Sequence, residues 1–508
     1  MRVAQWLRSP TIGQAGGGRA MGQRSVPSRL PTRSPVAGLR RRGLSFPEVL
    51  AQSVSALAPS AAIVVVPSIV LVESGAATLP AFVVATLLVL LVGWCLTQFG
   101  RRMAAVGGTY SYTAKGLGPV GALVGGWALL VGYAAVAMSA LTGAAVYTAG
   151  LLGARPTPGV VAVLAAGLGV LATLCTVRGI QLSARVALAL EVLSIGVVLA
   201  VLGVLLLGAR GGPGSAAPVV DAPVTWGGVA VAVVLGVTGF MGFESAATLG
   251  VEARRPLVAV PRAVLWTPAV AGLLFVAATA AQVVLLRAAP LDVLTSPVPV
   301  AELADREGLV LLRRVLDLGI AASFLACVTG STNALGRVLF SMGREGVLPA
   351  RLGRTHDRFE TPHVALAVVL PAVVGVPVVA LLAGGGPRAV LTASLTVSAF
   401  GYVVAYVLAC LAMPLFLRRI GELTAPAAAG GLVAGGGGLV VLVGAMAGIT
   451  VSGDRAVVVV FLAAMLPGLA WTAWLRLRDP GRLRPVGVYD TATASSVLPG
   501  SVPAGRRR

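Results

Sequence analysis

The chain of 508 residues alternates between long apolar blocks and short polar or basic stretches. An α-helix needs about 20 apolar residues to cross the hydrocarbon core of a bilayer. The blocks predict helical spans over 47–71, 79–99, 119–150, 158–177, 184–208, 226–250, 263–286, 315–341, 363–384, 389–417, 427–449 and 456–475. The pattern therefore predicts an all-α integral membrane protein with about 12 transmembrane helices. The lipid bilayer that surrounds these helices is an expected partner.

Composition excludes a water-soluble enzyme, because 57% of the residues are hydrophobic and only 11% are charged, against roughly 25% charged residues in soluble domains. The net charge of +21 is not read as a nucleic-acid signal, because the arginines are spread between the apolar blocks. If the amino terminus is inside, 31 of the 39 basic residues fall in cytoplasmic segments. This bias predicts a multi-pass protein of the cytoplasmic membrane with both termini in the cytoplasm.

The same pattern suggests a division of the chain into four parts. Residues 1–43 are an Arg-rich stretch without an apolar run, which predicts a disordered cytoplasmic arm and no signal peptide. A ten-helix core follows over 44–420, then two peripheral helices over 421–476 and a flexible tail over 477–508. The four cysteines stand alone in apolar blocks and form no metal or disulfide pattern, so neither a cofactor nor a metal is expected.

Two predicted spans contain residues that interrupt a helix. The first span contains Ala58-Pro59-Ser60-Ala61-Ala62, and the sixth contains a cluster of glycines over residues 236–242 followed by Glu244. Proline removes a backbone donor and glycine weakens a helix. In lipid, such breaks persist where the freed backbone groups line a cavity or bind a ligand.

The two breaks are five spans apart, which inverts their direction across the membrane. This offset is typical of two inverted repeats, here about 45–210 and 225–420, with a substrate site between their broken helices. Free N–H groups at a broken helix start suit an anion, and free carbonyls suit a cation. The alternative is that glycine and proline mark only kinks or close packing.

Three motifs resemble those of the amino acid–polyamine–organocation (APC) superfamily of permeases. Residues 239–245 read GFMGFES and are followed by EARRP (252–256) and VPRA (260–263); residues 107–112 read GGTYSY and are followed by GGW (125–127); residues 333–337 read NALGR and are followed by GREGVLP (343–349). The resemblance covers roughly residues 45–420. It implies a LeuT-type fold, with a 5+5 inverted repeat plus two peripheral helices, and secondary active transport of an amino acid or related amine by alternating access.

The resemblance also implies a substrate site. Its residues are Pro59, Ser60, Ala61 and Ala62 in the first break, Thr238, Gly239, Phe240 and Met241 in the second, and Tyr133 and Ser331 on neighbouring spans. The first break departs from the Gly-rich pattern of the family, and Ala253 replaces the second acid of a cytoplasmic pair. Glu252, Arg262 and Arg337 are expected to make gating or structural contacts at the cytoplasmic side.

Two acids lie inside predicted spans, where ionisable groups are functional candidates. Glu191 lies in the fifth span, at a place where some relatives carry a lysine proposed to replace a bound sodium ion, and we expect it to be the proton-coupling group. The alternative is a membrane-edge acid paired with Arg178 or Arg185. Glu244 follows the second break, where it either caps the second half-helix or takes part in gating.

A sodium site is the rival coupling scheme. It would use carbonyls at the first break together with hydroxyls of the eighth span, namely Ser323, Thr329, Ser331 or Thr332. Exchange transport, a polyamine or another organic amine as substrate, and a channel remain alternatives. A membrane-embedded enzyme is disfavoured because no HExxH, GxSxG or paired aspartate motif lies in the spans.

Overall fold

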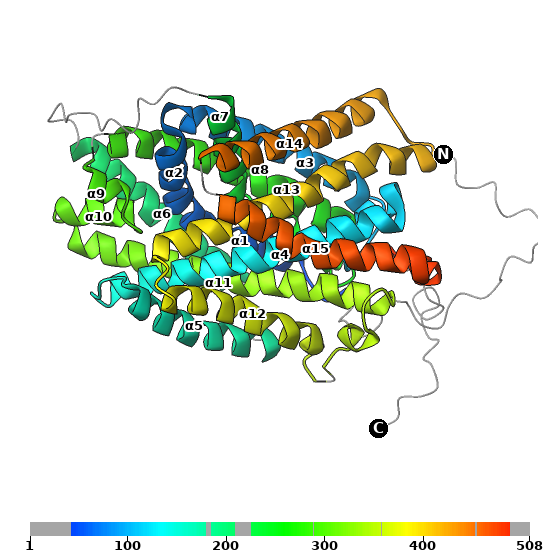
Figure 1. The fold of residues 1–508 in the computed structure, drawn as a ribbon. Helices are drawn as coiled ribbons and strands as arrows, with labels where there is room; N and C mark the ends of the chain where they lie inside the picture. The colour runs from blue at the N-terminus through cyan, green and yellow to red at the C-terminus, as the bar shows by residue number, and fades with distance from the viewer. Residues whose placement is uncertain are drawn as a thin grey trace, which may run out of the picture. The chain divides into compact units, whose positions relative to one another are not determined.

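A computed structural model describes residues 42–178, 184–208, 225–287, 289–356, 358–452 and 455–487. The predicted arm and tail lie outside these ranges except for residues 42–43 and 477–487. The described residues form helices joined by turns, with one isolated β-bridge between Leu44 and Ala253 (Figure 1). The prediction of an all-α protein is therefore confirmed.

Helices cover every predicted span. In the first half they are α1 (Phe46–Leu57), α2 (Pro59–Ser74), α3 (Thr78–Gly100), α4 (Thr109–Leu151), α5 (Pro158–Arg178) and α6 (Ala184–Gly208). The second half holds α7 (Trp226–Thr238), the 3₁₀-helix η4 (Phe243–Leu249), α8 (Pro256–Arg287), α11 (Val310–Arg344), α12 (His363–Leu382) and α13 (Pro387–Arg419). The last two are α14 (Ala425–Ser452) and α15 (Arg455–Arg478).

Fewer than twelve membrane spans are found when each helix is judged by its length and apolar composition alone. Nine helical stretches in the described ranges are long and apolar enough to cross a membrane, or ten if α7 and η4 form one span. One of the nine is the whole stretch Phe46–Gly100, and α11 is not among them. The count of twelve therefore stays a prediction.

Close packing of α4 against α13 forms one side of the core (Figure 1). A Cβ atom at Gly116 would lie 2.0 Å from the carbonyl oxygen of Ala412, and one at Gly401 would lie 2.6 Å from that of Ala128. Only glycine permits backbones to approach so closely. These two helices can therefore serve as a firm wall for the cavity described below.

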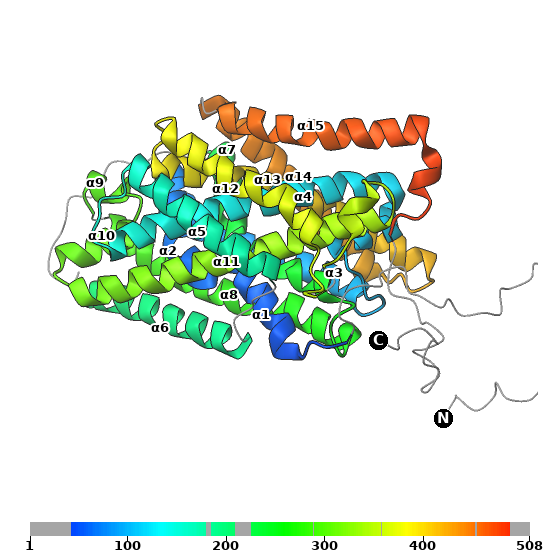
Figure 2. The ribbon, with the colours of Figure 1, turned by 90° about the horizontal axis from the view of Figure 1, so that it is seen from below.

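Short helices cover one end of the long ones. α9 (Leu291–Leu294) and α10 (Pro299–Arg306) lie in the connection between α8 and α11 (Figure 2). Arg388 of α13 donates to the carbonyl oxygens of Leu294 and Ser296, at 3.0 and 2.5 Å. Asp292 accepts a hydrogen bond from Arg306, which holds the pKa of this aspartate below its usual range.

A proline inside α2 has a polar partner on α8. Pro67 has no N–H, so the carbonyl of Ile63, four residues earlier, lacks its helical donor. The Gln282 side chain donates to this carbonyl through Nε2 at 2.5 Å, and both groups are buried. The hydrogen bond fastens α2 to α8 beyond the first break.

Replacing Gln282 is therefore expected to destabilise the protein. Gln282→Leu leaves the Ile63 carbonyl without a donor and should lower the free energy of unfolding by about 1–3 kcal/mol. Adding Pro67→Ala restores a backbone N–H to this carbonyl and should recover most of the loss. Thermal unfolding in detergent measures both effects, with Pro67→Ala alone as the control. A double variant as unstable as Gln282→Leu would contradict the pairing.

Candidate functional site

The first predicted break is present at Ala58. This residue has φ 52° and ψ 62°, a left-handed conformation that separates α1 from α2. Pro59 follows as the first residue of α2, a position that suits proline because its missing N–H is not needed there. The sequence Ala-Pro therefore ends one helix and starts the next in the middle of the first span.

The second predicted break follows Thr238. α7 ends there, a turn runs over residues 239–242, and η4 leaves at an angle of 44° to α7. Gly242 has φ 95°, which favours glycine, and a Cβ atom on it would lie 2.7 Å from the carbonyl carbon of Ala56. The two breaks therefore touch each other, although they are far apart in the sequence.

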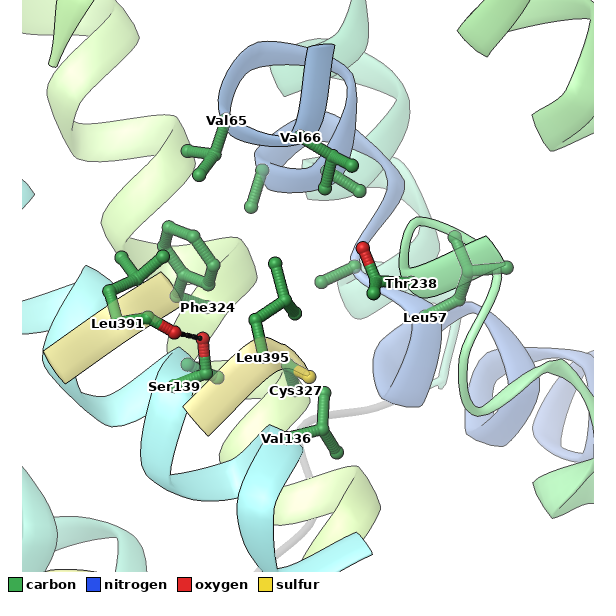
Figure 3. A pocket seen from close by; sticks show the side chains of 14 residues that line it. Leu57, Val65, Val66, Val136, Ser139, Thr238, Phe324, Cys327, Leu391 and Leu395 are labelled. Atoms are coloured by element: carbon green, nitrogen blue, oxygen red, sulfur yellow. Dashed lines mark hydrogen bonds between the residues drawn. The ribbon is translucent and has the colours of Figure 1, made fainter. Parts of the chain in front are cut away.

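A cavity of about 40 Å³ lies beside both breaks (Figure 3). Its lining comes from the break in span 1 and from α4, α7, α11 and α13: Leu57, Ala58, Ala61, Ala62, Val65, Val66, Val136, Ser139, Ala140, Thr238, Phe324, Cys327, Leu391 and Leu395. A buried water needs roughly 10–15 Å³ measured in this way. The cavity therefore has space for a few waters, and a larger solute needs its wall to move.

Glu191 is on α6, and its carboxylate reaches the start of α2. Its Oε1 accepts a hydrogen bond from the Ser60 N–H at 2.7 Å and from the Ser323 hydroxyl at 3.1 Å. The side chain is buried and, among the described residues, forms no ion pair with Arg178 or Arg185. A carboxylate on α6 thus joins the first break to α11.

Glu244 makes a second buried carboxylate contact. Its Oε1 accepts from the Tyr133 hydroxyl at 2.5 Å and its Oε2 from the Tyr406 hydroxyl at 2.6 Å. Because Tyr133 is on α4 and Tyr406 on α13, the glutamate ties η4 to both wall helices. Tyr406 is not among the site residues predicted from the sequence. Its spacing of four from Tyr402, which places both rings on one face of the span, was the available signal.

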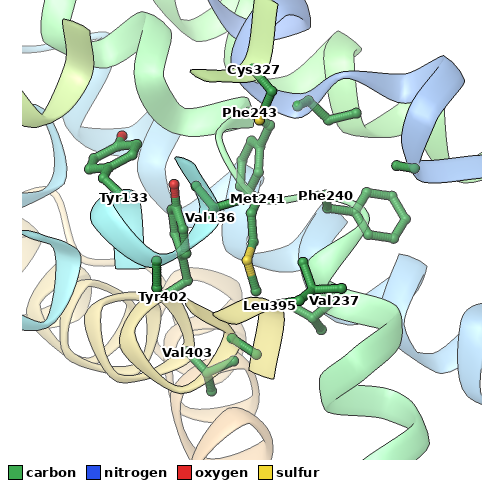
Figure 4. Close-up of a cluster of buried hydrophobic side chains, with 14 of the residues drawn as sticks. Tyr133, Val136, Val237, Phe240, Met241, Phe243, Cys327, Leu395, Tyr402 and Val403 are labelled. Carbon is green, nitrogen blue, oxygen red and sulfur yellow. The ribbon is translucent and has the colours of Figure 1, made fainter. Parts of the chain in front are cut away.

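The remaining expected site residues surround the cavity without lining it. Figure 4 shows Phe240 and Met241 pointing in different directions. The ring of Phe240 packs edge-on against Phe275 at 4.7 Å, and the Met241 sulfur accepts a hydrogen bond from Ser398 at 3.1 Å. Gly239 also lies against Phe275, and Ser331 is buried 3.8 Å from the Cys327 sulfur. Ala61, Ala62 and Thr238 are the expected residues that reach the cavity.

Backbone pairing holds the residues just before α1 to the exit from η4, and an ion pair joins that exit to α11. Leu44 donates to the Glu252 carbonyl at 2.9 Å and accepts from the Arg254 N–H at 2.8 Å. The Glu252 carboxylate lies 2.8 Å from Arg337 of α11, and both side chains are about 10% exposed. Arg262, also expected here, is exposed on α8 and forms no ion pair with Glu252 in the described structure.

Comparison with known proteins gives matches over most of the chain. A family model described as "Amino acid permease" matches residues 44–467. An uncharacterized transporter of Mycobacterium tuberculosis is 31% identical over 319 residues, which cover 61% of this chain and 66% of that protein. The branched-chain amino acid permease BcaP of Bacillus subtilis is 25% identical over 326 residues, covering 58% and 65%.

Two further similarities bear on substrate range and fold. The low-affinity putrescine importer PlaP of Escherichia coli is 25% identical over 304 residues, covering 57% of this chain and 64% of that protein. All these alignments span slightly less than two thirds of the relatives' own length. A solved manganese transporter of Eremococcus coleocola superposes with a TM-score of 0.56 at 12% identity, covering 89% of this chain and 99% of that one, which shows a shared fold.

Proposed function

The chain belongs to the amino acid permease family within the APC superfamily and has the LeuT-type fold, and we propose that it is a secondary active transporter. It moves an amino acid or related amine across the cytoplasmic membrane by alternating access, with both termini in the cytoplasm and a proton as the coupling ion. The observation that carries this proposal is the cavity where the two interrupted helices meet. A break that leaves backbone groups beside a cavity is how transporters of this architecture hold a solute.

Opening of this cavity requires the broken helices to move relative to α11 and to the wall formed by α4 and α13. Glu244 holds η4 to Tyr133 and Tyr406 of that wall. The Glu252–Arg337 ion pair holds the exit from η4 to α11. In our proposal these contacts form and break as the site opens to one side of the membrane, so they act as gating contacts.

Glu191 is the proposed proton-coupling residue. Its carboxylate contacts the first turn of α2 and a hydroxyl of α11, and it has no cationic partner among the described residues. A buried charge without a partner is costly. Binding or loss of one proton therefore changes the charge at the junction of the moving break and the wall.

The four hydroxyls on α11 that were considered for a sodium site have different partners. Ser323 donates to Glu191, whereas Thr329 and Thr332 donate to carbonyls of their own helix. Ser331 lies beside Cys327. Of the four hydroxyls considered for a sodium site, Ser323 is the one bonded to Glu191, which in turn accepts from the Ser60 N–H of the first break.

A native thiol provides the test of the proposed site. Cys327 lines the cavity, and Cys95, Cys175 and Cys410 do not. In a Cys95→Ala/Cys175→Ala/Cys410→Ala background, a permeant maleimide should label Cys327 as the transporter cycles. A transported amino acid or amine should slow this labelling at least fivefold, because it fills the cavity and stabilises its closed form by mass action. Mass spectrometry of the labelled protein measures the rate.

Two controls make the result specific. Cys327→Ser in the same background should remain unlabelled, and a sugar of similar size should leave the labelling rate unchanged. Failure of every amino acid and amine to slow labelling, with Cys327 reactive throughout, would contradict a substrate site at the meeting of the two breaks.

A further inference from the structure

The polar side chains of the cavity offer hydrogen-bond acceptors and no free donors. Ser139 donates its hydroxyl hydrogen to the Leu391 carbonyl at 3.0 Å, as Figure 3 shows, and Thr238 donates its own to the Leu235 carbonyl at 2.5 Å. The Cys327 thiol donates to the Ala56 carbonyl at 3.1 Å. A hydroxyl or thiol has one hydrogen, so all three present only lone pairs to a ligand.

The start of α2, where a substrate carboxylate would be expected to bind, has few donors left. Pro59 has no N–H, the Ser60 N–H binds Glu191, and the Ala62 N–H donates to the Ala58 carbonyl at 3.0 Å. Ala61 is the one residue of this turn that can still offer an N–H to the cavity. The helix start also carries a partial positive charge, and the Glu191 carboxyl group already contacts it through the Ser60 N–H.

The end of α7 also favours a cation over an anion at this site. Thr238 is the last residue of α7 and lines the cavity, so the partially negative end of this helix faces the site. A carboxylate placed here would meet at most the Ala61 N–H and the Ser60 hydroxyl, which has no partner among the described residues, and a buried carboxylate with so few donors is disfavoured. An ammonium group would meet acceptors and a favourable helix dipole.

The structure assigns this site to a monoamine that carries an ammonium group on an apolar body and has no carboxylate. This inference rests on the proposed transport function and narrows its substrate class. The body would contact the apolar part of the lining, which includes Val65, Val66, Phe324, Leu391 and Leu395. No acidic side chain lines the cavity, so a second ammonium, as in a diamine, would have no counter-charge.

Matched pairs of compounds that differ only in the carboxylate test the inference. Leucine is compared with 3-methylbutylamine, and phenylalanine with 2-phenylethylamine, by competition for Cys327 labelling and by thermal shift of the purified full-length protein. Each amine should bind at least tenfold more tightly than its amino acid. 1,4-Diaminobutane should bind at least tenfold more weakly than 3-methylbutylamine.

A double variant provides the converse measurement. Pro59→Ala restores a backbone N–H at position 59, and Glu191→Ala frees the Ser60 N–H. The combination should raise the affinity for leucine and lower that for 3-methylbutylamine, so that their ratio shifts at least tenfold towards the amino acid. Pro59→Ala alone should shift the ratio less.

The outcomes separate this inference from the proposed function. Leucine or phenylalanine binding as tightly as its amine would overturn the inference and leave a transporter of amino acids. Tighter binding of the diamine would overturn it in favour of a polyamine site. If no amine or amino acid binds or protects Cys327, both the inference and the proposed function fall.

Discussion

Glu191→Gln is expected to abolish the stimulation of uptake by an inward proton gradient. The amide keeps an oxygen that can accept from the Ser60 N–H and the Ser323 hydroxyl, as the carboxylate does at 2.7 and 3.1 Å, but it cannot exchange a proton. The first break and α11 therefore stay connected while the charge change is lost. Uptake into proteoliposomes, with and without an imposed pH gradient, should differ several-fold for the native protein and should be equal for the variant.

The control makes the same Glu-to-Gln replacement at another position of the chain. Glu307 is exposed in the connection before α11, and Glu307→Gln should retain the full response to the gradient. Replacing sodium by choline should leave the native uptake unchanged. A Glu191→Gln protein that still responds to the pH gradient would remove Glu191 from the coupling scheme, and a loss of uptake in choline would favour the sodium scheme.

Loss of the Tyr406 hydroxyl is expected to have the second large effect. Tyr406 and Tyr133 both donate a hydroxyl to the buried Glu244 carboxylate, at 2.6 and 2.5 Å. Hydrogen bonds to a charged group contribute about 1.5–3 kcal/mol each, and leaving a buried acceptor unsatisfied adds to the loss. Tyr406→Phe should therefore lower the rate of transport by roughly tenfold or more and raise the labelling rate of Cys327, because η4 is no longer held to α13.

Tyr402 provides a matched control on the same helix. Its ring lies 5.7 Å from that of Tyr406 and is buried, but its hydroxyl has no hydrogen-bond partner in the described structure. Tyr402→Phe removes the same atom from the same face and should change transport by less than twofold. Equal effects of the two variants would mean that ring packing matters here, and that the hydrogen bond to Glu244 does not hold the gate.

Both breaks could be predicted from local sequence. Proline at position 59 cannot supply a helical N–H, and the glycines around position 240 weaken a helix wherever they stand. Their backbone consequences, the left-handed Ala58 and the positive φ of Gly242, arise within a few residues of these positions. The apolar blocks likewise predicted every long helix, because a bilayer requires long apolar segments whatever surrounds them.

The partners of the buried acids could not be predicted in this way. Glu191 and Ser60 are 131 residues apart, and Glu244 and Tyr406 are 162 residues apart. Membrane helices are apolar on all sides, so their sequence shows only weakly which face is turned inward. Arg337 rather than Arg262 therefore emerged as the partner of Glu252 only from the packing of α11.

The sequence by itself determined the membrane class, the position of each long helix and the two interruptions, because these depend on hydrophobicity and on the local chemistry of proline and glycine. Tertiary structure alone decided that the interruptions meet, that a cavity of about 40 Å³ lies beside them, and that Glu191 occupies a donor at the start of α2. Those features depend on the rotation and depth of helices that are distant in the chain. The rotation and depth of each helix are set by the close packing of many side chains at once.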